Sequence, residues 1–213
     1  MQKFIPIFPL NLVAFPGEVI NLHIFEPRYQ QLIRECYEEK KMFGIPVVEN
    51  NRMLDYGTEM ELVKIQKEYP NGEMDVKVKG VHVIQILETV KEVPGKLYDG
   101  AIVSVIQNIE DRHSRLFAEL EELTETLFAL LDIKQDIYKP DFVLNSFKLG
   151  HYVGFEFMEE YELLRHPRET SRQKLIVEHI KKILPSVRQI AEIKEKAKLN
   201  GHFRMTNPPD TLK

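Results

Sequence analysis

The feature that most constrains the fold is a change in the hydrophobic period midway along the chain. In the first half, apolar residues alternate with polar ones, as in half-buried strands, and Ile20, Leu22 and Ile24 show this pattern clearly. From Asp111 onward the apolar residues recur every three or four positions, as in amphipathic helices. The sequence therefore predicts an α+β fold in which a run of strands precedes a run of helices.

About six strands are expected in the first half. They lie at 20–24, 43–48, 57–66, 73–79, 81–90 and 98–107. Tyr69-Pro70-Asn71-Gly72 carries the Asn-Gly signal of a hairpin, and Phe15-Pro16-Gly17 places Pro and Gly as a type II turn requires. Pro46 cannot donate to a strand ladder, so we expect an edge or a bulge there. Because no helices alternate with these strands, a small barrel or curled sheet is favoured over an open parallel sheet.

One helix is expected among the strands. Pro27 suits a first helical position, and the helix should last to about Glu39. Its predicted apolar face consists of Tyr29, Leu32, Ile33 and Cys36. Its predicted outer face carries Arg28, Gln31 and Glu35, which are candidates for contact with a partner.

The second half predicts several helices. The first begins near Asp111, the second at Lys139-Pro140-Asp141, and the third spans Phe157 to Leu164. A long fourth helix starts at Pro167, should kink or split at Pro185, and has a plausible stop at Asn200-Gly201. We therefore expect a β subdomain over 1–110, a helical bundle over 111–203 that packs against it, and a loose tail over 204–213.

From its composition and its N-terminus we expect a cytoplasmic protein. Cys36 is the single cysteine and cannot form an internal disulfide. The N-terminus has no signal-peptide pattern, and no run of about 18 apolar residues predicts a membrane span. Charge is uneven: from Arg165 onward there are 12 Lys/Arg and 5 Asp/Glu, which gives +7 there and −11 before it. RNA binding by this basic segment is an open alternative, although aromatic interleaving and a docking motif are missing.

Catalytic and metal-binding patterns are scarce. No glycine-rich phosphate loop and no histidine pair spaced for zinc are found, so we expect no cofactor and no metal. Ser171 and Lys174 match a Ser-x-x-Lys spacing, but the accompanying motifs of such hydrolases are absent. The cluster Glu159, Glu160 and Glu162 is expected to be a solvated helix face. His23 is expected to bond to a neighbour rather than act as a general base.

Several separated motifs occur in the order seen in a known family. They are Phe8-Pro9-Leu10, Val13, Phe15-Pro16-Gly17, Leu22 to Tyr29, Phe43-Gly44-Ile45, Tyr56-Gly57-Thr58, Gly80 and the region from Leu163-Leu164 to Leu184. On these residues the chain resembles the amino-terminal, substrate-binding domain of Lon-type ATP-dependent proteases. The resemblance departs from the family after Gly80, where Val83 and Ile84 stand in place of an Arg and Phe pattern.

The resemblance implies a PUA-like β-barrel followed by a helical bundle, and a role in recognising polypeptides or partner proteins. It does not imply proteolysis, since the ATPase and Ser-Lys peptidase domains of those proteases are not in this sequence; we expect a stand-alone, non-enzymatic module. Aromatic residues between the predicted helices, Phe155, Phe157 and Tyr161, are candidates to line a groove. The motif residues expected to be structural are Phe15, Pro16, Gly17, His23, Phe25, Glu26, Pro27, Arg28, Tyr29 and Gly44.

Overall fold

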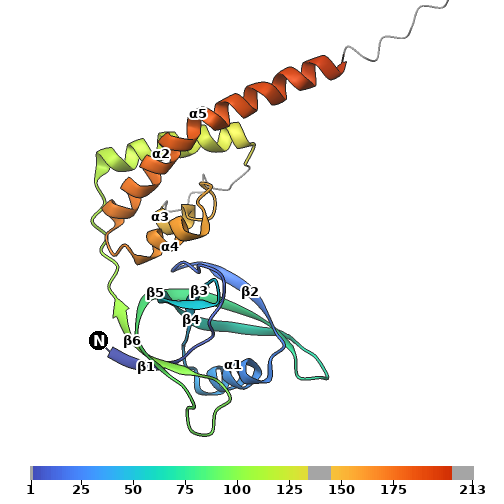
Figure 1. Ribbon diagram of the computed structural model, residues 1–213, viewed down its shortest axis with the longest axis vertical. Helices are drawn as coiled ribbons and strands as arrows, with labels where there is room; N and C mark the ends of the chain where they lie inside the picture. Colours follow the sequence, from blue (N-terminus) through green and yellow to red (C-terminus); the bar gives the residue numbers. More distant parts are fainter. Residues whose placement is uncertain (1, 134–144, 203–213) are drawn as a thin grey trace, which may run out of the picture.

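The computed structural model describes residues 2–133 and 145–202, with side chains described up to residue 198. A curled antiparallel sheet forms one end of the molecule, and helices are stacked on one side of it (Figure 1). The elements are β1 (Gln2–Pro6), β2 (Val19–Ile24), α1 (Pro27–Glu39), β3 (Phe43–Glu49), β4 (Arg52–Glu68), β5 (Met74–Val90), β6 (Gly100–Ile106), α2 (Ser114–Leu131), α3 (Ser146–Leu149), α4 (Phe157–Arg165) and α5 (Glu169–His202). We call residues 2–106 the sheet region and residues 114–202 the helical region.

The sheet is curled, and its two ends, β1 and β3, approach each other. The strands follow the order β1-β6-β5-β4-β3, and β2 pairs with the first part of β5. The chain after β1 then forms parallel bridges with β3, from Ile7 to Gly44 and from Leu10 to Val47. The result is a mixed α/β protein whose sheet is mostly antiparallel, with α1 against one side.

The number of strands matches the sequence prediction, but the strands themselves differ. β1 was not predicted, since Gln2–Pro6 is short and contains a proline; its pairing with β6 depends on residues almost a hundred positions away. The two strands expected at 73–79 and 81–90 are one continuous strand, β5. Gly80 does not end this strand. It allows the turn at 15–17 to approach, because a Cβ there would lie 2.3 Å from the carbonyl oxygen of Phe15.

Local predictions in the sheet region are confirmed. α1 begins at Pro27, ends at Glu39 and buries the four expected side chains. The amide of Glu18 donates to the carbonyl of Phe15 at 3.1 Å, and Gly17 between them has φ +85°, which closes the predicted turn. β3 lies at an end of the strand order and shifts register beside Pro46, so that proline occupies both an edge and a bulge.

In the helical region, two of the predicted helices are found where expected, and one proline does not have the predicted effect. α2 and α4 lie where the period of the sequence places them. α5 continues through Pro185 instead of splitting and ends at His202, close to the predicted stop. Pro185 is on the exposed side of α5, where the backbone groups that its ring leaves unbonded can reach water. The helix start at 139–141 and the tail at 204–213 lie outside the described residues.

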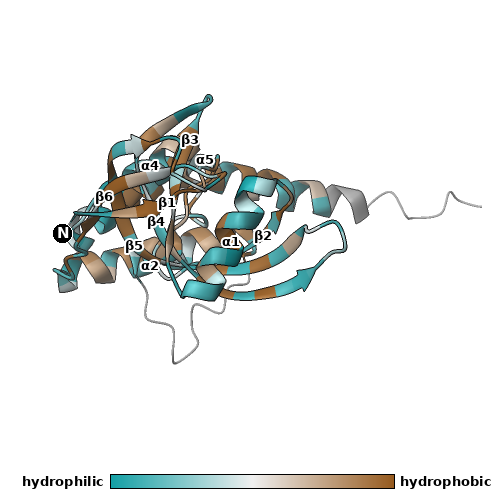
Figure 2. Cartoon of the chain, turned by 90° about the horizontal axis from the view of Figure 1, so that it is seen from below, coloured by the Kyte–Doolittle hydropathy of each residue, from teal (hydrophilic) through white to brown (hydrophobic). Residues whose placement is uncertain are grey.

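Among the described residues, three apolar clusters form the core, and one of them joins the two regions. The cluster beneath α1 and a smaller one near β1 belong to the sheet region. Seen from below, α1 turns a mainly hydrophilic surface outward, as expected for a helix whose apolar face is buried on the sheet (Figure 2). The third cluster combines side chains of α2 to α5 with Val13, Phe15, Val47 and Val83 of the sheet region. The helices therefore share a core with the sheet.

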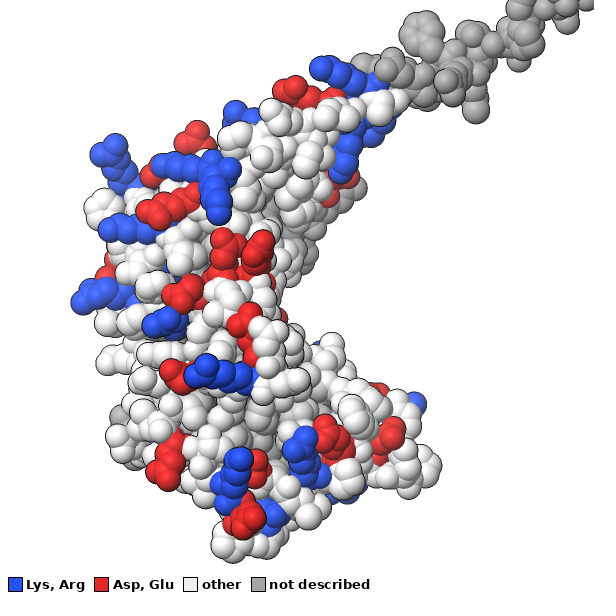
Figure 3. All heavy atoms as spheres, in the orientation of Figure 1, with Lys and Arg blue, Asp and Glu red and all other residues white. Residues whose placement is uncertain are grey.

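The outline of the molecule is concave on one side. α5 projects past the rest of the helical region, and the surface is hollowed between this projection and the sheet region (Figure 3). Among the helices in the described ranges, none combines the length and the apolar character needed to cross a bilayer.

Candidate functional site

A pair of clefts lies where the sheet region meets the helical region. Here the turn at 15–18 touches the segment that links α3 to α4. We call this place the junction site and define it by Phe15, Glu18, His151, Phe157 and Glu160. Two clefts open beside it, one of about 190 Å³ and one of about 310 Å³, and both are lined by Glu18 and His151.

The sequence Phe15-Pro16-Gly17-Glu18 fixes the sheet side of the junction site. The Glu18 carboxylate accepts a hydrogen bond of 2.9 Å from the Phe15 amide, which caps the turn from within. Gly17 donates to the carbonyl of Gly80 at 2.8 Å, and Gly80 donates back to Glu18 at 2.9 Å. The turn is therefore fastened to the middle of β5, and its orientation follows from the sheet.

The Phe15 side chain extends from the sheet region and packs in the core of the helical region. Its ring stacks on Phe147 with centroids 5.6 Å apart and lies 4.8 Å from the ring of His151. Gly150 makes this approach possible, since a Cβ there would come within 2.3 Å of the Phe15 ring. Only 1% of Phe15 is exposed, so this residue stabilises the contact between the two regions and has little surface left for a ligand.

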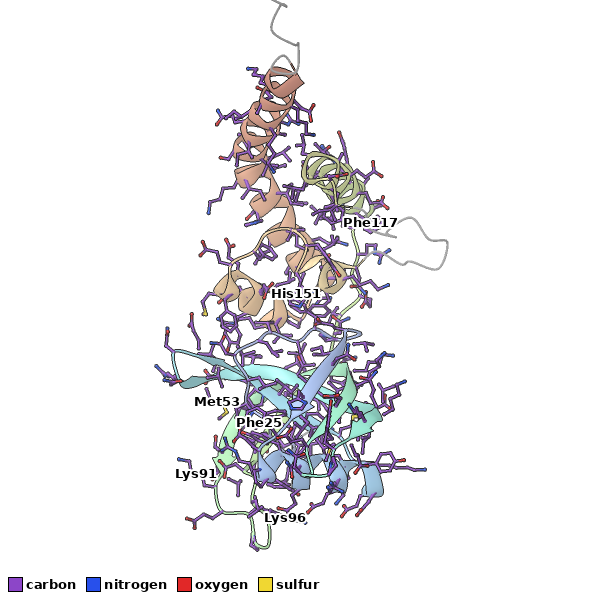
Figure 4. The ribbon with its side chains drawn as sticks, turned by 90° about the vertical axis from the view of Figure 1, so that its right-hand side faces the viewer. Phe25, Met53, Lys91, Lys96, Phe117 and His151 are labelled. Atoms are coloured by element: carbon purple, nitrogen blue, oxygen red, sulfur yellow. The ribbon has the colours of Figure 1, made fainter. Side chains whose placement is uncertain are left out.

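His151, in the segment between α3 and α4, contacts both α4 and the turn at 15–18 through its two ring nitrogens. Nδ1 lies 2.7 Å from Glu160 on α4, and Nε2 lies 3.2 Å from Glu18. The hydrogen bond to Glu160 is the largest cause, followed by that to Glu18, of a rise in the pKa of His151 to about 9, against which burial acts. The imidazole is therefore protonated at neutral pH and donates from both nitrogens. Figure 4 shows it at the boundary between the helices and the sheet.

The chemistry of the junction site suits binding. Its clefts combine apolar surface from Leu12, Ile20 and Phe157 with two carboxylates that share one imidazolium. Within the described part of the chain, no group of three or more His, Cys, Asp or Glu is arranged to hold a metal ion. Glu159 is bonded to the backbone at the start of α4 and Glu162 pairs with Arg165, so the acidic cluster is divided among separate partners.

The α1 candidates lie at the other end of the sheet from the junction site (Figure 1). Gln31 donates to the carbonyl of Gly95 at 3.2 Å and accepts from the amide of Leu97 at 2.8 Å. Glu35 accepts from Lys96 at 2.7 Å and from the Tyr98 hydroxyl at 2.5 Å. Burial opposes the change, but these hydrogen bonds lower the pKa of Glu35. Both residues thus hold the β5–β6 connection on α1, an intramolecular role that the sequence prediction did not include.

Arg28, the third α1 candidate, stays at the surface. Its guanidinium forms an ion pair of 2.7 Å with Glu26 and lies 4.5 Å from the centre of the Tyr29 ring.

The aromatic candidates separate into one at the junction site and two elsewhere. Phe157 lines the larger cleft. Tyr161 is buried, and its hydroxyl accepts from the amide of Tyr56 at 3.1 Å, which ties α4 to β4. Phe155 is partly buried against His179, with ring centroids 4.4 Å apart. The structure therefore brings only Phe157, of the six predicted contact residues, to the junction site.

The remaining motif residues occupy turns and contacts within the sheet region. His23 bonds to Asp75 at 2.7 Å, the first cause of its raised pKa, as expected for a residue held by a neighbour. Gly44 packs closely against Ile5, where a Cβ would meet the side chain at 2.8 Å. Phe25 was expected to be structural, but 60% of it is exposed, which is unusual for a large apolar residue with a structural role.

Neither the Ser171 and Lys174 pair nor the thiol of Cys36 has an activating environment in the described residues. Ser171 and Lys174 both lie in the described part of the chain, and no hydrogen bond joins them there. Burial raises the pKa of the Cys36 thiol to about 12, so the thiolate that reactivity requires is scarce.

Sequence reasoning missed the residues that make the junction site. Glu18 and His151 are 133 positions apart, and His151 is nine residues from Glu160 across an irregular segment. No spacing rule for a helix or a strand predicts either contact. The one available signal was Gly150 next to His151, since a glycine can mark a close approach of two segments.

The fold and the junction site define a class of protein: a curled antiparallel sheet with helices that share its core. Two solved structures have the same arrangement. A Lon N-terminal domain protein from Xanthomonas campestris is 21% identical with a TM-score of 0.62, and the match covers 82% of this chain and 97% of that one. The N-terminal domain of the Lon protease of the Mycobacterium avium complex is 15% identical with a TM-score of 0.65, covering 84% and 98%.

The family model for the substrate-binding domain of ATP-dependent protease La (LON) matches residues 5–200. The chain belongs to this family, and the resemblance seen in the sequence is confirmed.

Proposed function

We propose that this protein is a non-catalytic module that binds polypeptide segments, and that the junction site is part of the binding surface. The observation that carries the proposal is the match of residues 5–200 to a family defined by a substrate-binding domain. The geometry supports it in two ways. The clefts at the junction site are lined by apolar and carboxylate groups, and the turn that forms one wall contains the family motif Phe15-Pro16-Gly17.

The proposal includes the finer features of the fold. The bridges from the chain after β1 to β3 support a PUA-like barrel, and the core that α2 to α5 share supports a helical bundle. A buried, unpaired Cys36 fits the reducing cytoplasm, where we place the protein.

The proposal is tested with a chemically unfolded, alkylated model protein and the same protein in its native form. We expect saturable binding of the unfolded form and none of the native form. Asn11, an exposed residue that lines the larger cleft, gives the variant Asn11→Arg, which should fill that cleft and weaken binding. Gln66→Arg, on the exposed surface of β4, makes the same charge change away from the site and should leave binding unchanged. If the unfolded protein is not retained by the intact wild type, the proposal is wrong.

RNA binding through the basic part of α5 is the alternative. Several of these cations already have acidic partners, including Lys181 with Glu119 and Lys198 with Glu195, which reduces the charge left for phosphate. Binding of a single-stranded RNA that weakens steeply with added salt would favour the alternative, because phosphate contacts release counterions.

A further inference from the structure

We propose that the free edge of β2 takes up an extended segment of a partner polypeptide as an added strand, with a basic side chain of that segment at the junction site. This inference rests on the proposed function and names the way in which the polypeptide is recognised. It depends on the edges of the sheet rather than on the clefts alone.

β2 has one paired edge and one unpaired edge. It pairs with β5 in an unbroken register from Val19 opposite Lys79 to Ile24 opposite Met74. No other strand in the described part of the chain pairs with it. In an antiparallel pair, every second residue of a strand directs its amide and carbonyl away from the partner strand. The outer edge of β2 therefore offers a row of main-chain donors and acceptors.

The other free edges of the sheet carry features that oppose strand addition, and β2 does not. Proteins protect sheet edges with charged side chains, prolines, bulges or covering segments. β3 has Pro46 and a bulge, and is bridged by the chain after β1. β1 contains Lys3 and Pro6. The outer part of β4, residues 61–68, carries four charged residues and two register shifts.

The six residues of β2, by contrast, include no Lys, Arg, Asp, Glu or Pro and no register shift, and the one titratable side chain among them, His23, is bonded to Asp75 of the neighbouring strand β5. An edge of this kind is the part of a sheet most open to pairing with another chain.

The side chains around this edge favour an apolar segment. Val19 at the start of β2 is 50% exposed, and Phe25, directly after its end, is 60% exposed. Figure 4, which views the molecule from the side that is hollowed in Figure 3, shows Phe25 in the sheet region below His151. A segment along β2 would lie in this hollow and contact both exposed apolar side chains.

The edge leads into the junction site. Glu18 precedes β2 directly, and Ile20 within β2 lines the larger cleft together with Phe157 and Glu160. The two carboxylates there, Glu18 and Glu160, share the single positive charge of His151. The net charge of the group is negative, so it favours a lysine or arginine at that end of the added segment.

The test uses a synthetic peptide of about eight residues, the length of an ordinary strand, with alternating Val and Thr and one terminal Arg. Val19→Lys places a charge on the β2 edge and should weaken binding about tenfold or more. Val63→Lys is the matched control, since Val63 on β4 is 49% exposed and lies on an edge that is already protected. It should leave the affinity within about twofold.

Two N-methylated forms of the peptide separate main-chain pairing from side-chain contact. An added strand directs the amides of alternate residues toward β2 and the others toward solvent. Methylation of one alternate set should therefore abolish binding, while methylation of the other set should leave it nearly intact. Equal effects of the two methylated sets, or equal affinities of Val19→Lys and wild type, would overturn the strand-addition model.

The outcomes distinguish this inference from the function on which it rests. Wild-type protein that binds the unfolded model protein, with Val19→Lys binding it equally well, contradicts strand addition and leaves the proposed function standing. Wild-type protein that binds neither the peptide nor the unfolded protein contradicts both.

Discussion

The sheet region and the helical region each bury a carboxylate completely, but they neutralise it in different ways. In the sheet region, Glu59 accepts from Lys3 at 2.5 Å and from His82 at 3.1 Å, and both partners reach in from the surface with side chains 37% and 50% exposed. In the helical region, Glu169 pairs with Arg172 at 2.7 Å, and both are enclosed. The first arrangement is open to water, whereas the second is closed.

The enclosed pair holds the start of α5 to α3. Glu169 accepts from both the amide and the hydroxyl of Ser146, and Arg172 donates to the same hydroxyl and to the carbonyl of His166. Arg172 also lies over the ring of Phe147, which stacks on Phe15. Within the described ranges the named strands all lie in the sheet region, so no strand ladder holds the helices together. The comparison teaches that the packing of the helical region depends instead on a buried polar network next to the junction site.

The largest expected effect tests this difference directly. Arg172→Ala leaves the Glu169 carboxylate buried without its cation and should lower the free energy of unfolding by about 3–5 kcal/mol. Lys3→Ala removes a partner that water can replace at the surface, and should cost only about 1 kcal/mol. Chemical denaturation followed by circular dichroism measures both. Equal losses in the two variants would show that the buried pairs do not differ as described.

The second prediction concerns the link between the regions. Gly80→Ala would force a Cβ against the backbone of Phe15, 2.3 Å away, and should destabilise the protein by about 1–3 kcal/mol. Because the displaced turn carries Phe15 into the helical core, amide exchange in α3 and α4 should accelerate. Gly95→Ala is the control for a glycine without a close neighbour: Gly95 has open space around it, and its φ of +73° strains an alanine through the backbone alone, so exchange in α3 and α4 should stay unchanged. Faster exchange confined to the sheet region would contradict the coupling.

The smallest effect concerns pH at the junction. The pKa of His151 is raised from 6.5 to about 9 in the folded protein, so its contribution is complete below pH 6.5 and is lost as the pH rises through 9. Because about a third of the side chain is exposed, we expect a loss on the order of 1–2 kcal/mol over this range. His151→Gln should be less stable at pH 6 and should lack this part of the pH dependence. Parallel stability curves for the two proteins from pH 6 to 10 would rule out the charged network.

Much of the fold could be predicted because it is encoded locally. The bounds of α1 follow from Pro27 and from the spacing of its four buried residues. The bulge at Pro46 follows from a missing amide, and the turn at Gly17 from a positive φ. In each case the physical cause lies within a few residues of its effect.

The errors arose where the cause lies far away in the sequence. Two predicted strands proved to be one, because Gly80 serves an approach by Phe15 rather than a turn of its own. Gln31 and Glu35 were expected to face a partner, but the β5–β6 connection, more than 60 positions away, bonds to both. A helical pattern shows which side of a helix is polar, and it does not show what covers that side.

The sequence by itself determined the α+β class, most of the elements and the family, since hydrophobic period, turn residues and ordered motifs are properties of short segments. Only the tertiary structure decided the junction site, where Glu18, His151 and Glu160 meet, and left the outer edge of β2 without a partner strand among the described residues. The physical reason is that pairing and charge neutralisation act between atoms a few ångströms apart, and chain folding sets those distances independently of separation along the sequence.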